Sequence, residues 1–337
     1  MRVLVTGGAG YVGSVLTRML LDEGFDVTIL DRFFFGKESL EEISDQIRLV
    51  KGDTRWVDSS IMRGVDAVID MAALSNDPVG ELNPEMTLDI NYRARVRMSK
   101  FARKRGVRRY LLASSASVYG LKNRVCTEKT RVHPLTTYAK ANALWEAGAL
   151  PLANKKFCVT ALRQSSVYGI SKRMRFDIAF NNMVLSVFKG GKLPIMRDGT
   201  QVRPIIHIKD TCRAFISVLK AEPDLVNGQV FNAGSNDQNY QIFELARMAS
   251  KSVGAPFRYK WYGSPDFRSY TVNFDKIRTT LGFKPKFTPT DGAREVFNGL
   301  KKGVIASDEK TVTIQWYKRL QEYQQVVHDV ELRGRIL

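Results

Sequence analysis

Short runs of apolar residues alternate with amphipathic segments through the first half of the chain. The runs indicate buried strands and cover residues 2–6, 26–30, 47–51, 67–70, 109–113 and 158–162. Apolar residues recur with helical spacing in the longer segments between them, notably 11–23, 84–105 and 136–153. Strand–helix alternation of this kind predicts a parallel sheet covered by helices on both faces.

The alternation loosens after residue 165. Short strands are expected at 205–207 and 229–232, joined to the main sheet, with a helix at 209–220 between them. Further helices are expected at 241–252, 290–302 and 312–332. We therefore predict an α/β protein with a doubly wound parallel sheet, a Rossmann domain, formed by residues 1–165 and about 203–232. Residues 166–202 and 233–337 are expected to form a smaller, interleaved substrate lobe.

Composition limits the class of protein. No apolar run approaches the roughly 20 residues needed to span a bilayer, and the first residues lead straight into a strand, which leaves no room for a signal peptide. The cysteines Cys126, Cys158 and Cys212 are odd in number and widely spaced, so we expect buried apolar residues and not disulfides. We therefore expect a cytoplasmic protein without a membrane partner.

The net charge of +18 favours an anionic partner. The densest basic run, residues 100–109, falls at the end of a predicted helix, where cations complement the helix dipole. We interpret this run as a solvated helix end and do not predict nucleic-acid binding. The charge is compatible with a phosphate-bearing small substrate.

A glycine-rich turn, Gly7-Gly8-Ala9-Gly10-Tyr11-Val12-Gly13, follows the first strand and opens the first helix. Glycine lets the chain turn sharply there and brings the backbone close to a pyrophosphate. The N–H groups of the helix N-terminus then meet the phosphate charge. Asp31, at the end of the second strand, is placed to accept hydrogen bonds from an adenosine ribose. Together these features predict a dinucleotide site.

The residues after the second and third strands bear on the choice of cofactor. The Asp31 carboxylate would repel a 2′-phosphate and favours NAD, whereas the neighbouring Arg32 would attract one and leaves NADP open. Asp53, followed by Thr54, lies at the sheet edge where ligands of such sheets bind. An N-cap role for Asp53 is equally compatible with the sequence.

Further motifs extend along the chain. They are Gly52-Asp53, Ala72-Ala73, Asp89-Ile90-Asn91, Ser114-Ser115-Ala116-Ser117-Val118-Tyr119-Gly120, Pro134-Leu135-Thr136-Thr137-Tyr138, Val167-Tyr168-Gly169, Arg203-Pro204-Ile205-Ile206-His207 and Phe231-Asn232-Ala233-Gly234. With the glycine turn, these motifs make the chain resemble the extended short-chain dehydrogenase/reductase family. Within that family it is similar to the NAD-dependent nucleotide-sugar epimerases and dehydratases of the UDP-glucose 4-epimerase type.

The resemblance implies NAD as cofactor, a nucleoside-diphosphate sugar as substrate, and a homodimer formed through helices 84–105 and 136–153. Tyr138 would remove a sugar hydroxyl proton while hydride passes to NAD, Ser115 would hydrogen-bond the reacting oxygen, and an epimerase would return the hydride to the opposite face. The implied cofactor-binding residues are Gly7, Gly10, Tyr11, Val12, Gly13, Asp31, Arg32, Asp53, Thr54, Ala72, Ala73, Asn91, Tyr138 and Asn142. The implied substrate-binding residues are Ser75, Ser115, Ser166, Asn182, Arg203 and Arg268. No metal site is expected, because the three histidines lack ligand-like spacing.

The chain departs from the family pattern four residues after the tyrosine, where the family has lysine and this sequence has Asn142. A nearby ammonium lowers the pKa of a tyrosine, which is otherwise a poor base at neutral pH. Lys140 points to nearly the opposite side of the helix. Three explanations stay open: slower catalysis with the nicotinamide as the only local cation, a weak variant that binds without efficient turnover, or another basic residue folded into the gap.

A second departure concerns the reaction type. Dehydratases of the family usually carry an Asp-Glu pair where this chain has Ala116-Ser117, so elimination by that route is disfavoured. We therefore expect an epimerase. The alternatives are a nucleotide-sugar dehydrogenase or reductase, and a catalytically weak protein that binds NAD and a nucleotide sugar.

Overall fold

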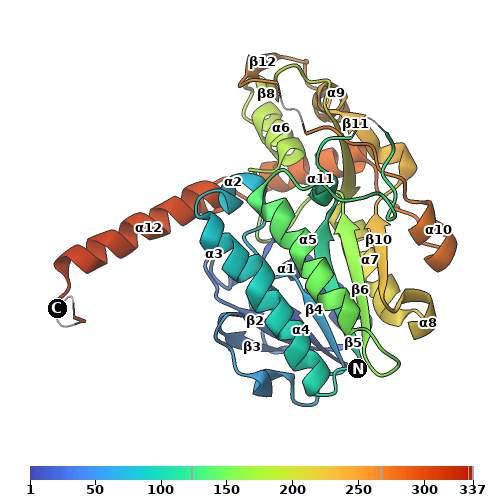
Figure 1. Ribbon diagram of the computed structural model, residues 1–337. Helices are drawn as coiled ribbons and strands as arrows, with labels where there is room; N and C mark the ends of the chain where they lie inside the picture. Colours follow the sequence, from blue (N-terminus) through green and yellow to red (C-terminus); the bar gives the residue numbers. More distant parts are fainter. Residues whose placement is uncertain (123, 266–267, 333, 336–337) are drawn as a thin grey trace.

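A seven-stranded parallel sheet forms the centre of the molecule, which is described by a computed structural model covering residues 1–122, 124–265, 268–332 and 334–335 (Figure 1). Its strand order is β10-β6-β5-β4-β1-β2-β3. The bounds are β1 Arg2–Thr6, β2 Asp26–Asp31, β3 Ile47–Lys51, β4 Ala67–Asp70, β5 Arg109–Ser115, β6 Cys158–Gln164 and β10 Gln229–Ala233. The chain reverses direction across the sheet between β1 and β4, and this confirms the doubly wound Rossmann fold.

The two faces of the sheet follow from the alternation of side chains along each strand. Val3 and Val5 of β1 pack into one core cluster with Leu16, whereas Leu4 packs into another with Trp145. The helices of the first face are α1 (Tyr11–Asp22) and α7 (Ile208–Lys220), and those of the second are α4 (Arg95–Lys104) and α5 (Thr137–Ala149). The central strands are therefore apolar on both sides, as the continuous runs in the sequence predicted, whereas the edge strand β3 is only partly buried.

The predicted helix 84–105 is continuous but not uniform. It starts as α3 (Pro84–Leu88), passes through a π-helical segment at Asp89–Ala94, and continues as α4. Asn91 lies in the π-helical segment, where its side-chain amide bonds the backbone of Leu74 in both directions, at 2.9 Å each. Segments of this kind occur often at functional sites, and here the widened turn fixes the loop that follows β4.

The smaller lobe surrounds its own apolar cluster beyond the carboxyl ends of the strands. Its helices are α6 (Ala179–Phe188), α9 (Ile242–Ser252) and α11 (Pro289–Lys301), with the strand pair β8 (Leu193–Met196) and β12 (Tyr259–Tyr262). The short helices α2 (Asp77–Gly80), α8 (Pro223–Val226) and α10 (Asp275–Leu281) lie in connections.

One strand assignment was wrong. The strand predicted at 205–207 is β9 (Val202–His207), and it lies outside the main sheet, between β7 (Ser166–Tyr168) and β11 (Asn239–Gln241). It pairs parallel to β7 and antiparallel to β11. Its apolar run therefore serves a small separate sheet, while the strand predicted at 229–232 does join the main sheet as β10.

The last helix, α12 (Thr313–Val330), leaves the body as an arm (Figure 1). Its first turns are anchored, because the Trp316 indole donates a hydrogen bond to the Phe34 carbonyl at 2.6 Å. The three cysteines are buried and unpaired, as expected. Among the helices of the described residues, we find none with both the length and the apolar character needed to cross a bilayer.

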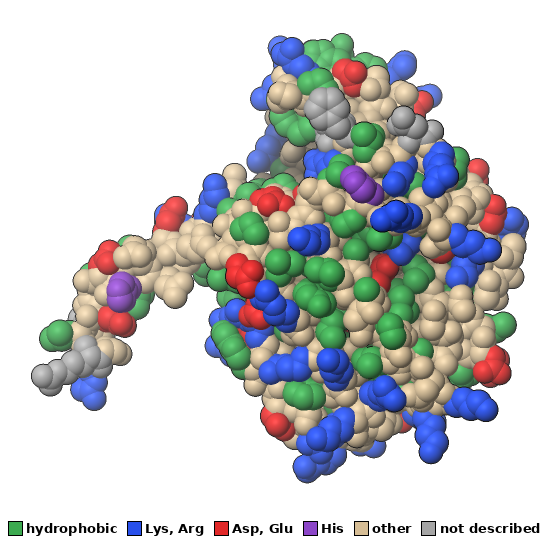
Figure 2. Space-filling view, viewed as in Figure 1, with side chains coloured by type: hydrophobic (Ala, Val, Ile, Leu, Met, Phe, Trp, Pro, Cys, Tyr) green, Lys and Arg blue, Asp and Glu red, His purple; other side chains and the backbone are tan. Residues whose placement is uncertain are grey.

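Lys and Arg side chains are spread over the face shown in Figure 2 and are interrupted by apolar and acidic groups. The basic run at the end of α4 contributes to this distribution, and Arg105 there donates to the Ser59 hydroxyl at 2.8 Å. On this face the positive charge does not gather into one continuous stripe, the arrangement that nucleic-acid binding favours.

Candidate active site

A cavity of about 580 Å³ lies where the carboxyl ends of the central strands meet the smaller lobe. It is flanked by β1 and β4, the strands at which the sheet reverses direction, where doubly wound sheets bind ligands. Its volume is in the range of small-molecule sites. Eighteen of the predicted site residues line it: Gly7, Gly10, Tyr11, Val12, Gly13, Asp31, Arg32, Asp53, Thr54, Ala72, Ala73, Ser75, Ser115, Tyr138, Ser166, Asn182, Arg203 and Arg268.

The glycine turn forms the floor of the cavity between β1 and α1. Gly7 has φ +71°, and a Cβ on Gly13 would lie 2.3 Å from the Gly7 carbonyl oxygen. Helix α1 begins after Gly10 with no side chain bound to its first N–H groups. Those groups and the helix dipole are therefore available to an anionic ligand.

The Tyr11 side chain has a structural role that the sequence did not indicate. Its hydroxyl donates to the Gly169 carbonyl at 2.7 Å and accepts from the Asn181 amide at 3.0 Å. Burial raises the pKa of Tyr11 well above its ordinary value. Tyr11 therefore ties the start of α1 to the smaller lobe, and only its backbone remains for a cofactor.

Asp31 stands at the cavity wall at the end of β2. Its carboxylate accepts hydrogen bonds from the N–H groups of Ala9, at 3.0 Å, and Phe33, at 2.7 Å. Burial raises the pKa of Asp31, and these backbone hydrogen bonds oppose the rise. The two bonds hold the carboxylate beside the glycine turn, as the dinucleotide prediction requires.

Arg32 and Asp53 bind each other. Asp53 accepts from Arg32 at 2.9 Å and from the Arg55 guanidinium at 2.9 and 3.1 Å. Burial alone would raise the pKa of Asp53, but the hydrogen bonds from Arg55 and Arg32 outweigh it and hold the pKa below its usual range. Asp53 receives the Arg55 N–H within a turn and no helix begins there, so the N-cap alternative is not supported. The charge of Arg32 is already paired, which weakens the case for a 2′-phosphate.

An aromatic wall lies on the same side of the cavity. Phe34 and Phe35 meet Tyr317 edge to face, with ring centroids 5.7 and 5.4 Å apart, and the Arg173 guanidinium lies 3.6 Å from the Phe35 centroid. Tyr317 comes from α12, nearly 300 residues along the chain from Phe34. No local signal in the sequence pointed to Tyr317 or Arg173.

Ser115 and Tyr138 approach the cavity from different elements. Ser115 ends β5, and its Oγ accepts from the Ser117 hydroxyl at 2.9 Å, so its own proton remains available for donation. Tyr138 lies in the first turn of α5, which Thr136 caps by accepting from the Ala139 N–H. Burial and the Asp77 charge raise the pKa of Tyr138, whereas Ser115, Arg95 and Asn142 favour the phenolate. The predicted pair is therefore assembled at one end of the cavity.

Asn142 and Asn91 lie behind the cavity wall and do not line it. Both are fully buried. The Asn142 amide donates to the Tyr138 carbonyl one turn earlier, at 3.0 Å, while its Oδ1 has no hydrogen-bond partner among the described residues. Asn91 reaches the site only through the loop at Leu74. Lys140 is exposed, as its helical position predicted.

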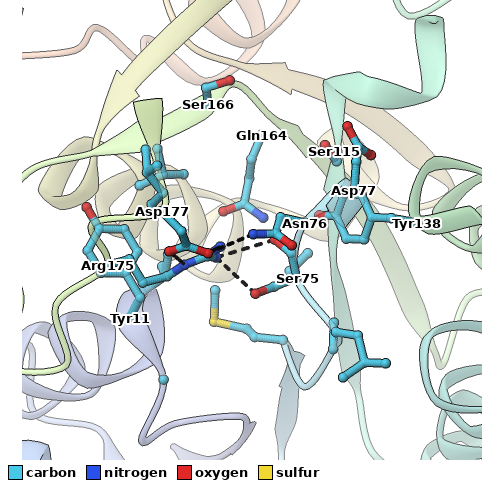
Figure 3. Close-up of a pocket in the computed structure, with 18 of the residues that line it drawn as sticks. Tyr11, Ser75, Asn76, Asp77, Ser115, Tyr138, Gln164, Ser166, Arg175 and Asp177 are labelled. Atoms are coloured by element: carbon cyan, nitrogen blue, oxygen red, sulfur yellow. Dashed lines mark hydrogen bonds and ion pairs between the residues drawn. The ribbon is translucent and has the colours of Figure 1, made fainter. Parts of the chain in front are cut away.

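A buried ion pair between Arg175 and Asp177 lines the cavity, and no motif in the sequence indicated it. Arg175 binds both Asp177 oxygens at 2.9 and 2.7 Å and donates to the Ser75 hydroxyl at 3.0 Å. The Asn76 amide also donates to Asp177 at 2.8 Å. Figure 3 shows Arg175 and Asp177 on one side of the view, Tyr138 on the other, and Ser75 and Asn76 between them. Ser75 is therefore held by the lobe, and the pair bridges the two parts of the molecule.

The predicted substrate-binding residues Ser166, Asn182, Arg203 and Arg268 lie along the lobe side of the same cavity. Arg203 donates to the carbonyl of Arg268, and the Arg268 guanidinium lies 2.5 Å from an Asp77 oxygen. The two arginines are therefore in direct contact. Arg268 is also linked to the Tyr138 end of the cavity, because its partner Asp77 acts on Tyr138.

Gln164, at the end of β6, is a further lining residue that the sequence analysis missed. Its amide nitrogen donates to the Ser114 carbonyl at 3.2 Å, and its buried Oε1 has no partner within the described part of the chain. Figure 3 places it between Arg175 and Ser115. An unpartnered buried acceptor of this kind suits a ligand donor such as an amide.

The chain is similar to known proteins over most of its length. The NAD dependent epimerase/dehydratase family matches residues 3–234. The UDP-glucose 4-epimerase of Lactobacillus helveticus is 31% identical over 86% of this chain and 94% of its own length. The UDP-N-acetyl-alpha-D-glucosaminuronate decarboxylase of Bacillus cytotoxicus is 25% identical over 95% of this chain and 98% of its own.

The fold is similar to that of a solved structure. MoeE5 in complex with UDP-glucuronic acid and NAD superposes with a TM-score of 0.80 at 26% identity, covering 90% of this chain and all of that one. The family match spans more than two thirds of the sequence and includes the glycine turn, Ser115 and Tyr138. The chain belongs to the NAD dependent epimerase/dehydratase family.

Proposed function

We propose that this protein is an NAD-dependent epimerase of a nucleoside-diphosphate sugar. The observation that carries the proposal is that one cavity is lined by the glycine turn and Asp31 as well as by Ser115 and Tyr138. A dinucleotide bound at the glycine turn and Asp31 would extend along the cavity toward Ser115 and Tyr138. The relatives whose names specify a substrate act on nucleotide sugars.

The residues fit NAD on structural grounds. A side chain at Gly13 would collide with the turn, the first N–H groups of α1 carry no side-chain cap, and Asp31 is held at the wall by two backbone hydrogen bonds. Gln164 offers a buried acceptor near Ser115, suited to a carboxamide N–H. When bound, NAD supplies a reversible hydride acceptor for the sugar carbon.

Tyr138 is the proton acceptor in this proposal. Its phenolate takes the proton of the sugar hydroxyl as the carbon is oxidised, and its hydroxyl returns the proton when the keto-sugar is reduced. Ser115, whose Oγ already accepts from Ser117, donates its proton to the reacting oxygen. Asn142 lies behind the cavity wall, one helical turn from Tyr138, so the ribose contact that the resemblance implied for it is left out of this proposal.

The lobe supplies the substrate contacts. Arg203 and Arg268 are suited to the diphosphate through their planar donor groups, and Asn182 and Ser166 to the remaining polar groups of the sugar nucleotide. Release of the sugar ring from one face and its return by the other requires no acid or base beyond Tyr138.

Epimerisation is favoured over elimination by what surrounds Ser115. The residues that follow it, Ala116 and Ser117, carry no carboxylate, and Ser117 is hydrogen-bonded to Ser115. Asp77, a carboxylate that acts on Tyr138, pairs with Arg268. A paired carboxylate is a poor general acid, so the site lacks the pair that elimination requires.

Residues 1–165 with about 203–232 remain our proposal for the NAD-binding domain, with β9 shared with the lobe. We also propose a homodimer through the face formed by α4 and α5, which pack side by side (Figure 1). Light scattering of the purified chain tests the dimer.

The experiment for the proposed function has two stages. Mass spectrometry of ligands released from the purified protein identifies the bound nucleotides, and NAD is expected. The protein is then incubated with UDP-glucose, UDP-glucuronic acid and UDP-N-acetylglucosamine, and the products are separated by chromatography. A stereoisomer without net cofactor consumption supports an epimerase; net consumption indicates a reductase or dehydrogenase, and binding without turnover indicates a binding protein.

A further inference from the structure

The proposed function gives Tyr138 the role of a base, and a phenolate in a partly buried site needs a cation nearby. Asn142, one turn along α5, is neutral. Lys140 is exposed. Three further titratable groups interact electrostatically with Tyr138: Asp77, Arg175 and Tyr270. Beside them lie Glu81, which bonds the N–H of Thr137, and the ion-pair partners Arg268 and Asp177.

Those flanking cations are neutralised by close partners. Arg175 binds both oxygens of Asp177, at 2.9 and 2.7 Å. Arg268 pairs with Asp77, whose own charge opposes the Tyr138 phenolate. Neither pair brings a clear surplus of positive charge to the phenol.

Arg95 is a cation that acts on the Tyr138 phenol, and its position is unusual. It is the first residue of α4, and its side chain is 1% exposed. One guanidinium nitrogen donates to the Asp70 carbonyl at 2.8 Å and lies 3.4 Å from the Ala113 carbonyl. Arg95 therefore bridges the ends of β4 and β5. Its contact on β5, Ala113, lies two residues before Ser115.

Arg95 contacts α5 at Trp145, two helical turns after Tyr138. The Arg95 Cζ lies 3.1 Å from the ring centroid of Trp145. Tyr138, Asn142 and Trp145 are spaced by four and three residues, so they share one face of the helix. The guanidinium thus lies along the buried face of α5 that also presents Asn142 and Tyr138.

The guanidinium is incompletely neutralised. Its Nε lies 3.7 Å from an Asp70 oxygen, beyond hydrogen-bond distance, and neither Nε nor Nη1 has a hydrogen-bond partner among the residues that the structure describes. Asp70 instead accepts from the hydroxyls of Thr6, at 2.6 Å, and Tyr110. A buried arginine with two unbonded donors is costly for stability alone, so a role in the site accounts for it better.

We propose that Arg95 supplies, from beneath α5, the fixed positive charge that stabilises the Tyr138 phenolate, and that Asn142 completes the layer between them as a neutral hydrogen-bonding group. Arg95 is a positioning residue, because it acts through Tyr138 and does not line the cavity. The direction agrees with the electrostatics, since Arg95 lowers the pKa of Tyr138 against the effects of burial and Asp77.

The test follows Tyr138 ionisation in the NAD complex by ultraviolet difference titration, with Tyr138→Phe subtracted from each protein. It needs no sugar, so it gives a result even if the proposed function fails. Arg95→Met is expected to raise the Tyr138 midpoint by about one pH unit, which is about tenfold less phenolate at any lower pH. Arg95→Lys is expected to stay close to wild type.

Two further variants separate charge from folding. Asp70→Asn removes the carboxylate that partly offsets Arg95, so the Tyr138 midpoint should fall, an effect that damage to the fold does not predict. Asn142→Lys should restore the midpoint in the Arg95→Met background. An unchanged midpoint in folded Arg95→Met overturns the proposal. If Arg95→Met does not fold, the Asp70→Asn midpoint decides: a fall supports the proposal, and no change overturns it.

Discussion

The guanidinium of Arg268 lies 2.5 Å from the carboxylate of Asp77 and joins the lobe to the segment beside Tyr138. Thr136, the residue that caps α5, donates to the other Asp77 oxygen at 2.6 Å. One carboxylate thus links Arg268, the proposed diphosphate ligand, with the helix that carries Tyr138, the proposed base. Substrate binding at Arg268 and proton transfer at Tyr138 are therefore expected to be coupled through Asp77.

Asp77→Asn is expected to make the enzyme more active at low pH. Asp77 raises the pKa of Tyr138, so its neutralisation lowers that pKa and increases the phenolate fraction below it. The acidic limb of the pH–rate profile should move down by up to about one unit, with up to about tenfold more rate on the limb. Glu85→Gln, on an exposed acid paired with Arg93, is the matched control. A limb that stays in place, or moves up, contradicts this coupling.

Asp31→Asn tests the ribose contact. Loss of the charged acceptor should weaken NAD binding by about tenfold to a hundredfold, because a hydrogen bond to a charged group contributes about 1.5–3 kcal/mol. The preference for NAD over NADP should narrow as well, since the repulsion of a 2′-phosphate is removed. Calorimetric titration measures both affinities, with Asp45→Asn on an exposed acid as control. Equal NAD affinity in the two variants would remove Asp31 from the site.

Gly13→Ala tests the close packing of the turn. The new Cβ would lie 2.3 Å from the Gly7 oxygen and 2.7 Å from the Gly8 Cα, so the backbone must shift. We expect the free energy of unfolding to fall by about 1–3 kcal/mol and the affinity for NAD to fall more than tenfold. Gly191→Ala is the control, because its nearest neighbour would lie 3.5 Å away. Urea unfolding and NAD titration measure the two effects; wild-type affinity in Gly13→Ala would show that the turn does not hold the phosphates.

The Glu295 carboxylate is expected to make a pH-dependent contribution to the free energy of unfolding. Burial would raise its pKa, but hydrogen bonds from His207, at 3.0 Å, and Lys209 lower the pKa to about 2. A carboxyl whose pKa is lowered by folding contributes its full stabilisation at any pH above its pKa in the unfolded chain. That contribution is lost as the pH falls toward 2. Glu295→Gln should therefore cost on the order of 2 kcal/mol at pH 7, and less below about pH 4.5. Urea unfolding across that range is the measurement, and a pH-independent difference would refute the assignment.

The main sheet could be predicted because each of its strands is marked by a local pattern in the sequence. Each is a short apolar run with turn residues at its ends, and a parallel sheet buried on both faces leaves no polar alternation to confuse the pattern. The glycine turn and Asp31 could be predicted for the same reason, since strand, turn and helix form one continuous segment. Strand β9 looked the same in the sequence, but its pairing with β7 and β11 is a tertiary choice that an apolar run does not encode.

The missed parts of the site are contacts between distant segments. Tyr317 reaches Phe34 and Phe35 because the first turns of α12 pack against the segment that follows β2. Arg175 and Asp177 lie in an irregular stretch where no periodicity marks them. The spacing of Tyr138 and Asn142 predicted that they share a helix face, but no pattern in the sequence indicated that Arg95 would be buried against the same helix.

The proposed function is tested most directly by proton magnetic resonance of the NAD-bound protein turning over a nucleotide sugar in heavy water. UDP-glucose and UDP-glucuronic acid are the first substrates to use. The account predicts a stereoisomer of the starting sugar whose inverted carbon keeps its original hydrogen, because hydride leaves and returns to the same carbon, and Tyr138→Phe should slow its appearance by at least about a hundredfold. Deuterium at the inverted carbon, or a bound nucleotide sugar that never inverts, would contradict it.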